Sequence, residues 1–186
     1  MKPPENSKEL ERLRAVQSYE ILDTAAESDF DDLVRMAGKL FKVPISTVTI
    51  LDEHRQWFKA SIGLPVKETA RDISFCTHAI EMREPLVVAD TKSDPRFKDN
   101  PLVQGAPNLV FYAGVPIIDK NDHAIGTFCI MDKYPRILSK NELELLKIFA
   151  NQAMMLLEVQ FQRDQICDLL AELDSLNEQL KLNERG

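Results

Sequence analysis

The spacing of hydrophobic residues predicts helices at both ends of the chain and short strands between them. Apolar residues at helical spacing over residues 10–16 predict a first helix that ends near Tyr19. Its start has two alternatives, either a capping box formed by Asn6 and Glu9 or a cap at Ser7.

A second amphipathic helix is predicted between Ser28 and Pro44. Ser28 is a favourable N-cap residue, and Asp31 at the third helical position would meet the positive end of the helix dipole. Pro44 ends the helix, because the residue before a proline avoids helical backbone angles. One face of the helix carries apolar residues at helical spacing, which are Phe30, Leu33, Ala37, Leu40 and Phe41.

β-branched and aromatic residues then predict five strands, at residues 45–51, 56–62, 86–89, 109–118 and 124–131. Polar turns join the first two strands and the last two strands, so each of these pairs is expected to form an antiparallel hairpin. Ser74 is expected to cap a short helix that runs to Glu81. The segment 90–108 is long and rich in proline, and an irregular segment of this length inside a compact domain is usually functional or mobile.

The last helix gives the clearest signal in the sequence. Ser139 and Glu142 form a second capping box, and neither Gly nor Pro interrupts the chain before Gly186, so the helix is predicted to exceed 40 residues. Up to Leu157 it has two apolar faces, and a helix that is apolar on two sides must bury both. One face would cover the domain and the other would need a partner. The two sets are Leu146, Phe149, Ala153 and Leu157, and Leu145, Ile148, Met155 and Val159.

Beyond Val159 a single apolar stripe continues in alternating steps of three and four residues, the spacing of a coiled-coil seam. β-branched residues at two a positions and Leu at two d positions favour a parallel two-stranded coil. Glu158 would face Arg163 of the partner helix, and such an exposed pair selects register more than it stabilises. Position a is occupied by Val159, Ile166, Leu173 and Leu180, and position d by Gln162, Leu169 and Leu176.

The alternative is a helix that folds back on its own domain, but no further apolar surface remains in the sequence to receive so long a stripe. Seven acidic and three basic residues from Glu158 onward leave a charge of −4 around the stripe, as a solvated coil requires. We therefore predict a homodimer whose interface contains Leu145, Ile148, Met155, Val159, Ile166, Leu169, Leu173, Leu176 and Leu180.

Composition excludes several classes of protein. The 186 residues are 44% hydrophobic and 28% charged, which is typical of a globular domain. A net charge of −7 without a basic cluster argues against a nucleic-acid binder. No apolar run spans a bilayer and the N-terminus has no apolar signal core, so we expect a soluble, cytoplasmic chain that binds no membrane. The cysteines, Cys76, Cys129 and Cys167, form no metal or disulfide pattern and are expected to be buried free thiols.

Motifs spread over residues 10–158 resemble those of GAF domains, which are sensory and regulatory modules. The resemblance is to the bacterial subgroup that precedes histidine kinases or diguanylate cyclases. The matching stretches, in chain order, are Tyr19-Glu-Ile-Leu-Asp-Thr24, Phe30-Asp-Asp-Leu33, Arg55-Gln-Trp-Phe-Lys59, Arg71-Asp-Ile-Ser-Phe-Cys-Thr-His78, Asp94-Pro-Arg-Phe97, Asn100-Pro-Leu-Val103, Phe111-Tyr-Ala-Gly-Val-Pro116 and Gly126-Thr-Phe-Cys-Ile-Met-Asp132.

The resemblance implies an α+β fold of the GAF type, similar to PAS and profilin folds. Its central antiparallel sheet would have about six strands, with helices on one face, a pocket against the other face, and a long C-terminal helix. Since the residues alone predict five strands, one strand is missing from that prediction. The implied division is a flexible leader at 1–9, a GAF domain at 10–158, and a coiled-coil signalling helix at 159–186 that leads to an output domain outside this chain.

The implied function is non-catalytic, with no metal and no cofactor. A small ligand of unknown identity, or a partner, would bind the domain and bias the dimeric helices, as the N-terminal part of a histidine kinase or diguanylate cyclase. One alternative is a GAF-fold enzyme that reduces free methionine sulfoxide, although the cysteine pattern of those enzymes is not matched. The other is a ligand-free dimerisation spacer. The signatures of bilin-binding and cyclic-nucleotide-binding GAF domains are also not matched.

Candidate ligand residues are aromatic side chains that either line a pocket or fill the core, and polar residues near them. Arg71 and Arg96 would recognise an anion or amide, or would instead pin the irregular segment through Asp72, Asp90 or Asp94. The candidates are Trp57, Phe58, Arg71, Ser74, Phe75, Cys76, Asp90, Arg96, Phe97, Phe111 and Tyr112.

Two cysteines and one histidine could suggest a metal site or catalysis, but their positions argue against both. Cys76 and His78 lie two positions apart on a helix and so cannot hold one metal ion, and we expect His78 to bond a carboxylate or backbone group. Alternation along a strand places Cys129 on the face opposite Phe128 and Ile130.

Overall fold

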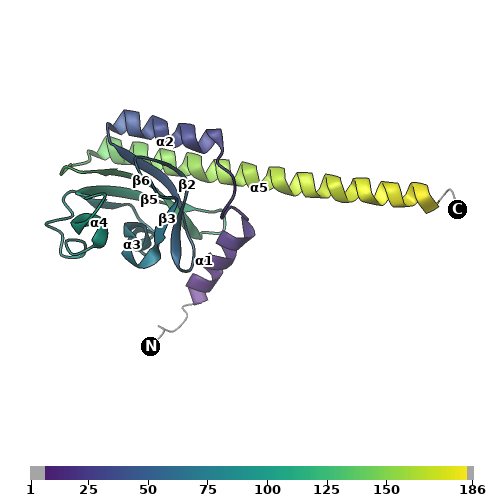
Figure 1. Ribbon diagram of the computed structural model, residues 1–186, viewed down its shortest axis with the longest axis horizontal. Helices are drawn as coiled ribbons and strands as arrows, with labels where there is room; N and C mark the ends of the chain where they lie inside the picture. Colours follow the sequence, from purple (N-terminus) through teal and green to yellow (C-terminus); the bar gives the residue numbers. More distant parts are fainter. Residues whose placement is uncertain (1–6, 184–186) are drawn as a thin grey trace.

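A computed structural model describes residues 7–183 and places one antiparallel sheet at the centre of the domain (Figure 1). The strands follow the order β3-β2-β1-β6-β5-β4, so β1 and β6 lie in the middle although they are far apart in the sequence. The sheet has six strands: β1 (Ile45–Leu51), β2 (Arg55–Ile62), β3 (Glu68–Ala70), β4 (Leu86–Val88), β5 (Phe111–Ile118) and β6 (Ala124–Asp132).

Helices cover both faces of this sheet. α2 and α5 lie side by side on one face, and α3 packs across β5 and β6 on the other (Figure 1). The irregular segment that contains α4 lies on the same side as α3 (Figure 1). The helices are α1 (Ser7–Ser18), α2 (Ser28–Phe41), α3 (Phe75–Met82), α4 (Pro101–Gln104) and α5 (Lys140–Asn183), and a 3₁₀ turn (Arg71–Ile73) precedes α3.

Alternation along the strands divides the buried side chains into two cores. On β6, Phe128 and Ile130 face the core under α2 and α5, which we call the helix-side core. Cys129 and Met131 face the core under α3, which we call the α3-side core. Both faces of β6 are buried along its length, and the predicted orientation of Cys129 is confirmed.

The predicted fold class is confirmed, and the missing strand is β3. β3 has three residues and pairs with β2 at the edge of the sheet. Such a short strand contains too few alternating positions to give a sequence signal. The first helix ends at Ser18, close to the predicted Tyr19, whereas the cap expected at Asn6 involves a residue outside the described part of the chain.

The start of α2 differs slightly from the prediction. Glu27, not Ser28, is the N-cap residue, and its side chain makes no capping hydrogen bond. Ser28 is therefore the first helical residue, which moves Asp31 one position further into the helix. Ser74 does cap α3 as predicted, because its hydroxyl accepts a hydrogen bond from the backbone N–H of Cys76.

α5 is one continuous helix of 44 residues, as the absence of Gly and Pro predicts. Its capping box is formed, with Glu142 N donating to the Ser139 hydroxyl and Ser139 N donating to the Glu142 carboxylate. The face that contains Leu146, Phe149 and Leu157 is buried on the sheet. Beyond the domain the helix projects away from it, so the alternative in which the helix folds back is wrong (Figure 1).

α1 is fixed to the domain by a cluster of charged groups. Glu9 pairs with Arg12 at 2.8 Å and with Arg71 at 2.7 Å, and Arg12 Nη1 donates to the carbonyl oxygen of Leu51. Burial raises the pKa of Glu9, but hydrogen bonds from Arg12 and Arg71 outweigh burial and lower the pKa from 4.5 to about 2. The cluster therefore stabilises the fold while Glu9 is ionised.

Within the part of the chain that the structure describes, no helix combines the length and apolarity needed to cross a lipid bilayer.

Gly126 allows β6 to approach β1 closely, and we predict that Gly126→Ala strongly destabilises the domain. A Cβ atom at this position would lie 1.9 Å from the carbonyl oxygen of Thr49, a backbone atom in a central strand that cannot move away alone. We expect a loss of about 3 kcal/mol in the free energy of unfolding, measured by urea denaturation. Gly105→Ala is the matched control, because its Cβ would lie 3.2 Å from the nearest atom, on an exposed turn. Equal losses for the two variants would contradict this account.

A second prediction concerns the pH dependence of stability. The pKa of Glu9 is lower in the folded chain than in the unfolded chain, so its ionisation stabilises the fold above pH 4.5, and this stabilisation is lost as the pH falls toward about 2. Glu9→Gln should be less stable than the wild type at pH 7, and the difference should disappear near pH 2. Thermal unfolding at several pH values would measure this. A difference that stays constant with pH would contradict the role of Glu9.

Candidate functional site

The α3-side core contains a stack of aromatic rings. The ring centroids of Phe75 and Phe97 lie 4.3 Å apart, and those of Phe75 and Tyr112 lie 5.1 Å apart. Phe75 belongs to α3, Tyr112 to β5 and Phe97 to the irregular segment, so the stack joins three parts of the fold. All three rings are buried, which places this part of the predicted pocket in a filled core.

Beneath the stack lies a buried cluster of polar groups. The sulfur atoms of Cys76 and Cys129 are 3.4 Å apart, and the hydroxyl oxygen of Tyr112 is 3.3 Å from each. Thr127 Oγ1 lies 3.0 Å from the Cys129 sulfur and 2.6 Å from Thr49 Oγ1. These five side chains satisfy one another in the middle of the sheet, where an unpaired polar group would be costly. We call them the thiol cluster.

The two thiols of this cluster differ in acidity. Burial raises the pKa of Cys76, but hydrogen bonds outweigh burial, that of Cys129 first, and bring the pKa to about 6. Burial raises the pKa of Cys129 well above its usual value, and the hydrogen bond and charge of Cys76 raise it further. Burial also raises the pKa of the Tyr112 hydroxyl, which therefore stays protonated and can donate to a thiolate.

A surface cleft of about 600 Å³ opens beside α3. Arg71 and Ser74 line it, together with residues of the β1–β2 turn and of the exposed side of α3. Its other lining residues are Glu53, His54, Ala70, Asp72, Thr77, His78 and Glu81. The cleft lies next to the thiol cluster, because Ser74 is the residue that caps the helix carrying Cys76.

Arg71 keeps part of its guanidinium group available to this cleft. Nη1 donates to Glu9 and to the carbonyl oxygen of Asp52. Within residues 7–183, every hydrogen bond of the Arg71 side chain runs through Nη1. The expected pairing of Arg71 with Asp72, Asp90 or Asp94 is wrong, because α1 brings Glu9 to it instead. A fork of N–H donors pairs well with a carboxylate, phosphate or amide oxygen.

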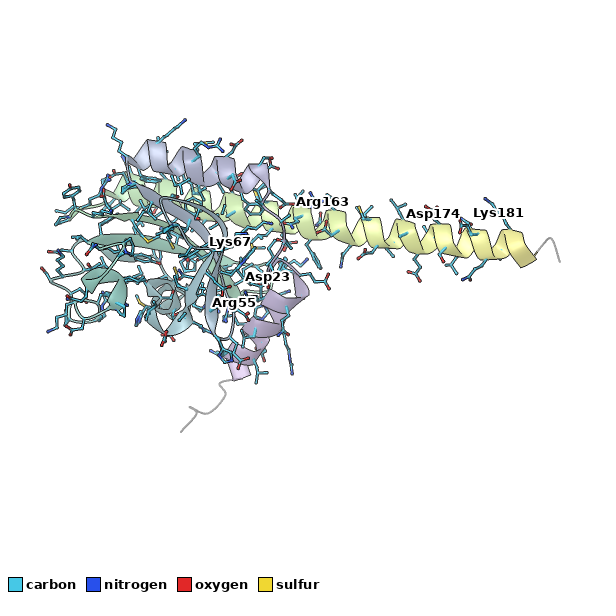
Figure 2. The ribbon with its side chains drawn as sticks, viewed as in Figure 1. Asp23, Arg55, Lys67, Arg163, Asp174 and Lys181 are labelled. Carbon is cyan, nitrogen blue, oxygen red and sulfur yellow. The ribbon has the colours of Figure 1, made fainter. Side chains whose placement is uncertain are left out.

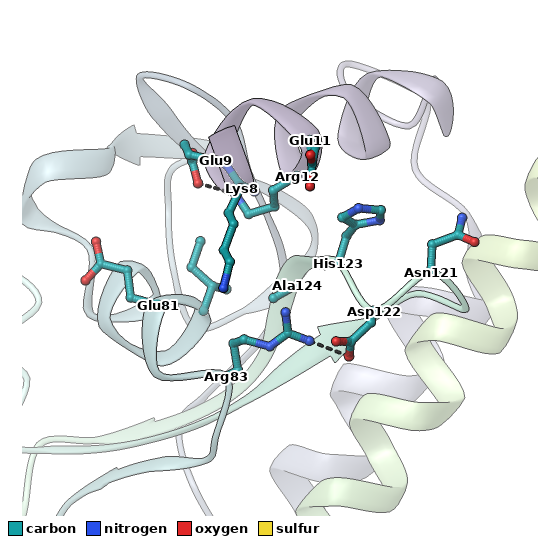
Figure 3. Close-up of a pocket in the computed structure, with 11 residues that line it drawn as sticks. Lys8, Glu9, Glu11, Arg12, Glu81, Arg83, Asn121, Asp122, His123 and Ala124 are labelled. Carbon is teal, nitrogen blue, oxygen red and sulfur yellow. Dashed lines mark hydrogen bonds and ion pairs between the residues drawn. The ribbon is translucent and has the colours of Figure 1, made fainter. Parts of the chain in front are cut away.

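A second pocket, of about 540 Å³, lies between α1, the end of α3 and the β5–β6 turn (Figure 3). Arg83 forms an ion pair there with Asp122, and Glu9 accepts hydrogen bonds from Arg12 (Figure 3). Both arginines of this pocket, Arg12 and Arg83, are thus already paired with carboxylates. We therefore place the candidate ligand site at the cleft that contains Arg71.

The other candidate residues lie apart from this cleft. Trp57 and Phe111 face the helix-side core, on the opposite side of the sheet from Tyr112. Phe58 is buried on β2 opposite Thr49. One pocket therefore cannot include all eleven candidates.

Asp90 and Arg96 lie in the irregular segment. Asp90 accepts hydrogen bonds from Lys92 N and from the Ser93 hydroxyl, which stabilises a turn. Arg96 pairs with Asp94 at 2.7 Å and lies over the ring of Phe97, so the expected pinning by Arg96 is confirmed.

The histidines differ in part from expectation. His78 is exposed and places its ring at right angles to that of Phe97, without the expected bond to a carboxylate or backbone group in the described chain. His54 is exposed, whereas His123 is half-buried and lies 3.1 Å from a carboxylate oxygen of Asp119. No cluster of three metal-ligating residues occurs between residues 7 and 183.

The predicted seam of α5 is exposed from the domain to the tail. Ile148 is 53% exposed, Val159 62% and Leu180 60%, which is far above the exposure of a core residue. Met155, Ile166, Leu169, Leu173 and Leu176 are also exposed, whereas Leu145 is half-buried against the helix-side core. Figure 2 shows Asp174 and Lys181 among the side chains that surround the projecting part of the helix.

The charged residues that flank the seam have partners within the chain. Glu158 accepts a hydrogen bond of 2.6 Å from the Tyr19 hydroxyl, and Arg163 pairs with Glu27 at 2.9 Å. Glu27 also pairs with Lys59, whose side chain is fully buried. These contacts join the first turns of the projecting helix to the residue after α1, to the N-cap of α2 and, through Glu27, to β2. The sequence could not reveal them, because each joins residues more than 30 positions apart.

Comparisons with known proteins agree with this fold. A family model described as GAF domain matches residues 26–157. A cyclic di-GMP phosphodiesterase of Pseudomonas aeruginosa is 39% identical over 153 residues, which are 82% of this chain and 26% of that protein. The chain therefore spans about a quarter of the length of this curated relative.

Solved structures show the same fold at low sequence identity. The GAF domain of a phosphoenolpyruvate-protein phosphotransferase from Acinetobacter has a TM-score of 0.61 and 20% identity, covering 86% of this chain and 98% of that one. A type II free methionine-R-sulfoxide reductase from Thermoplasma acidophilum has a TM-score of 0.61 and 18% identity, covering 77% and 97%. The blue-light absorbing form of a GAF domain from Thermosynechococcus elongatus has a TM-score of 0.60 and 17% identity, covering 87% and 96%. From its sequence motifs, its sheet and these matches, the chain belongs to the GAF domain family.

Proposed function

We propose that this GAF domain is a non-catalytic sensory module that forms a parallel homodimer through α5 and relays a signal along it. The observation that carries the proposal is the continuous exposed seam from Ile148 to Leu180. Contiguous exposed apolar side chains mark an interaction surface, since monomeric proteins rarely leave such surfaces open.

A second copy of the chain is the partner that this seam fits best. Val159 and Ile166 at a positions, with Leu169 and Leu176 at d positions, favour two parallel strands. The charged residues around the seam are mostly acidic, as the exposed outer side of a solvated coil requires. A basic partner is therefore not needed to explain the apolar stripe. Glu158 and Arg163 are engaged within the chain, so the predicted pair between them would not set the register. The apolar seam itself would do so.

The signal would pass from the domain to the coil through the contacts at its first turns. Tyr19, Glu27 and Lys59 connect α5 to three other elements, so a change in the domain would shift or rotate the start of the coil. A ligand biases such an equilibrium only by binding one arrangement more tightly than the other.

The cleft beside α3 is the proposed ligand site. Arg71 would hold an anionic or amide group with the N–H donors that its contacts to Glu9 and Asp52 leave available, and Ser74 lies beside it. The buried aromatic stack would lie behind the ligand and would not need to open for the ligand to bind.

The output would belong to a cyclic di-GMP enzyme or to a histidine kinase. The relative from Pseudomonas aeruginosa is named a cyclic di-GMP phosphodiesterase, and most of its length lies outside the matched region. Its name therefore supports a cyclic di-GMP signalling context for the domain and assigns no catalysis to this chain.

We predict that Leu173→Lys weakens association at least about a hundredfold, because each dimer would lose two buried leucines at a central a position. Sedimentation analysis over a range of concentrations would measure the change in Kd. Ala171→Lys is the matched control, since position 171 lies on the outer side of the coil and should leave association nearly unchanged. A wild-type chain that remains monomeric at tens of micromolar would contradict the proposal.

We further predict that the natively purified chain retains a small molecule and that Arg71→Gln loses it. Mass spectrometry of the compounds released on denaturation would identify it. Glu9→Gln is the control, because it removes the same ion pair but keeps the guanidinium group in the cleft. Equal retention by Arg71→Gln and the wild type would exclude this site, and no retained molecule in any variant would favour a dimerisation spacer.

A further inference from the structure

The two buried thiols of the thiol cluster lie close enough to react with each other. Cys76 is on α3 and Cys129 on β6, and their sulfur atoms are 3.4 Å apart with both residues buried. A disulfide bond is about 2.05 Å long, so the sulfurs would need to approach by roughly 1.4 Å. A small displacement of α3, a helix of eight residues, would provide this approach.

The surroundings of Cys76 favour its thiolate. Its position in the first turn of α3 places it at the positive end of the helix dipole, where thiolates are stabilised. The Tyr112 hydroxyl lies 3.3 Å from the sulfur, and the Thr49 hydroxyl 3.8 Å. The lowered pKa of Cys76 and the raised pKa of Cys129 agree with this geometry. Cys76 is thus the better nucleophile of the pair, and Cys129 is the thiol that remains protonated beside it.

We propose that Cys76 and Cys129 form an oxidisable dithiol that a small hydroperoxide converts to an intramolecular disulfide. The Cys76 thiol gives up its proton and its sulfur attacks one oxygen of hydrogen peroxide. The O–O bond breaks, the departing hydroxide takes up the proton that the thiol released and becomes water, and Cys76 is left as a sulfenic acid. The Cys129 sulfur then attacks the Cys76 sulfur, the S–O bond breaks, and the hydroxyl group leaves with the Cys129 proton as a second water. The two sulfurs together lose two electrons, which reduce the peroxide.

Access to the dithiol needs a local opening of the α3 side. The rings of Phe75 and Phe97 cover the cluster, and Phe97 comes from the irregular segment, whose backbone is held mostly by turns. Such segments open more readily than a central sheet, and hydrogen peroxide is small enough to enter through a brief opening. The third cysteine, Cys167, is exposed on α5, so the expectation that it is buried is wrong. It serves as an internal reference for a thiol outside the thiol cluster.

The disulfide would tie α3 covalently to the centre of the sheet. α3 also supplies one wall of the cleft that contains Arg71, through Thr77 and His78. Oxidation would therefore fix the position of this wall. The proposal itself depends on neither a ligand nor a dimer, because it needs only the two sulfurs and a peroxide.

The test is oxidation of the folded full chain by hydrogen peroxide. After acid quenching, free thiols are blocked under denaturing conditions and the peptides are mapped by mass spectrometry. We expect a link between Cys76 and Cys129 that thiol reductants reverse, in a Cys167→Ser background as well as in the wild type. The same treatment of the wild-type chain unfolded in urea should give mixed pairings that include Cys167. A folded chain without the link, or with no preference over the mixed pairings, would overturn the proposal.

Two variants assign the roles of the sulfurs. Cys129→Ser should accumulate a sulfenic acid on Cys76, trapped by a cyclic diketone, and should form no link. Cys76→Ser should leave Cys129 unlabelled. Circular dichroism checks that each variant is folded, and the wild-type peptide map tests the link even if a variant is not. Trapping on Cys129 in Cys76→Ser, with none on Cys76 in Cys129→Ser, would overturn the assignment of Cys76 as the thiol that attacks the peroxide.

Discussion

Burial of the central sheet on both faces is the constraint on which the other features of this domain depend. β1 and β6 lie in the middle of six strands, and every residue of both strands is buried. Because side chains alternate between the two faces of a strand, neighbouring residues lie in different environments. Phe128 helps to hold α5 in place, while the next residue, Cys129, belongs to a polar cluster under α3. The domain thereby separates a face that supports a long helix from a face that can carry chemistry.

The two faces are connected at the end of the domain from which α5 projects. Glu9 on α1 pairs with Arg71 on the cleft side, and Tyr19, the residue directly after α1, donates to Glu158 on α5. The same short helix thus borders both the proposed ligand site and the start of the coil. Lys59 gives a further connection, since it reaches from the sheet to Glu27, which in turn binds Arg163. Because the side chain of Lys59 is buried, its positive charge would be costly without an acidic partner.

Features set by local patterns could be predicted from the sequence, and features set by long-range packing could not. The capping box at Ser139 and the apolar spacing after it were sufficient to predict α5, and turn residues predicted both hairpins. β3 gave no signal because three residues cannot show a period. The partners of Cys76 could not be foreseen either. Thr49 and Thr127 come from strands where threonine is common, and only the pairing of β1 with β6 brings them together. Arg71 was identified as a candidate, but its partner Glu9 lies 62 positions away.

The unbroken run of α5 has a consequence for any domain joined to it. A helix advances by 1.5 Å and turns by about 100° with each residue, so the distance and the angular orientation of a following domain are coupled. Adding or removing seven residues would nearly preserve the angular phase and alter only the spacing. A change of three or four residues would overwind or unwind a supercoil locally, and would present a different side of the attached domain to its twin. Functional linker lengths after this domain should therefore cluster at intervals of the heptad.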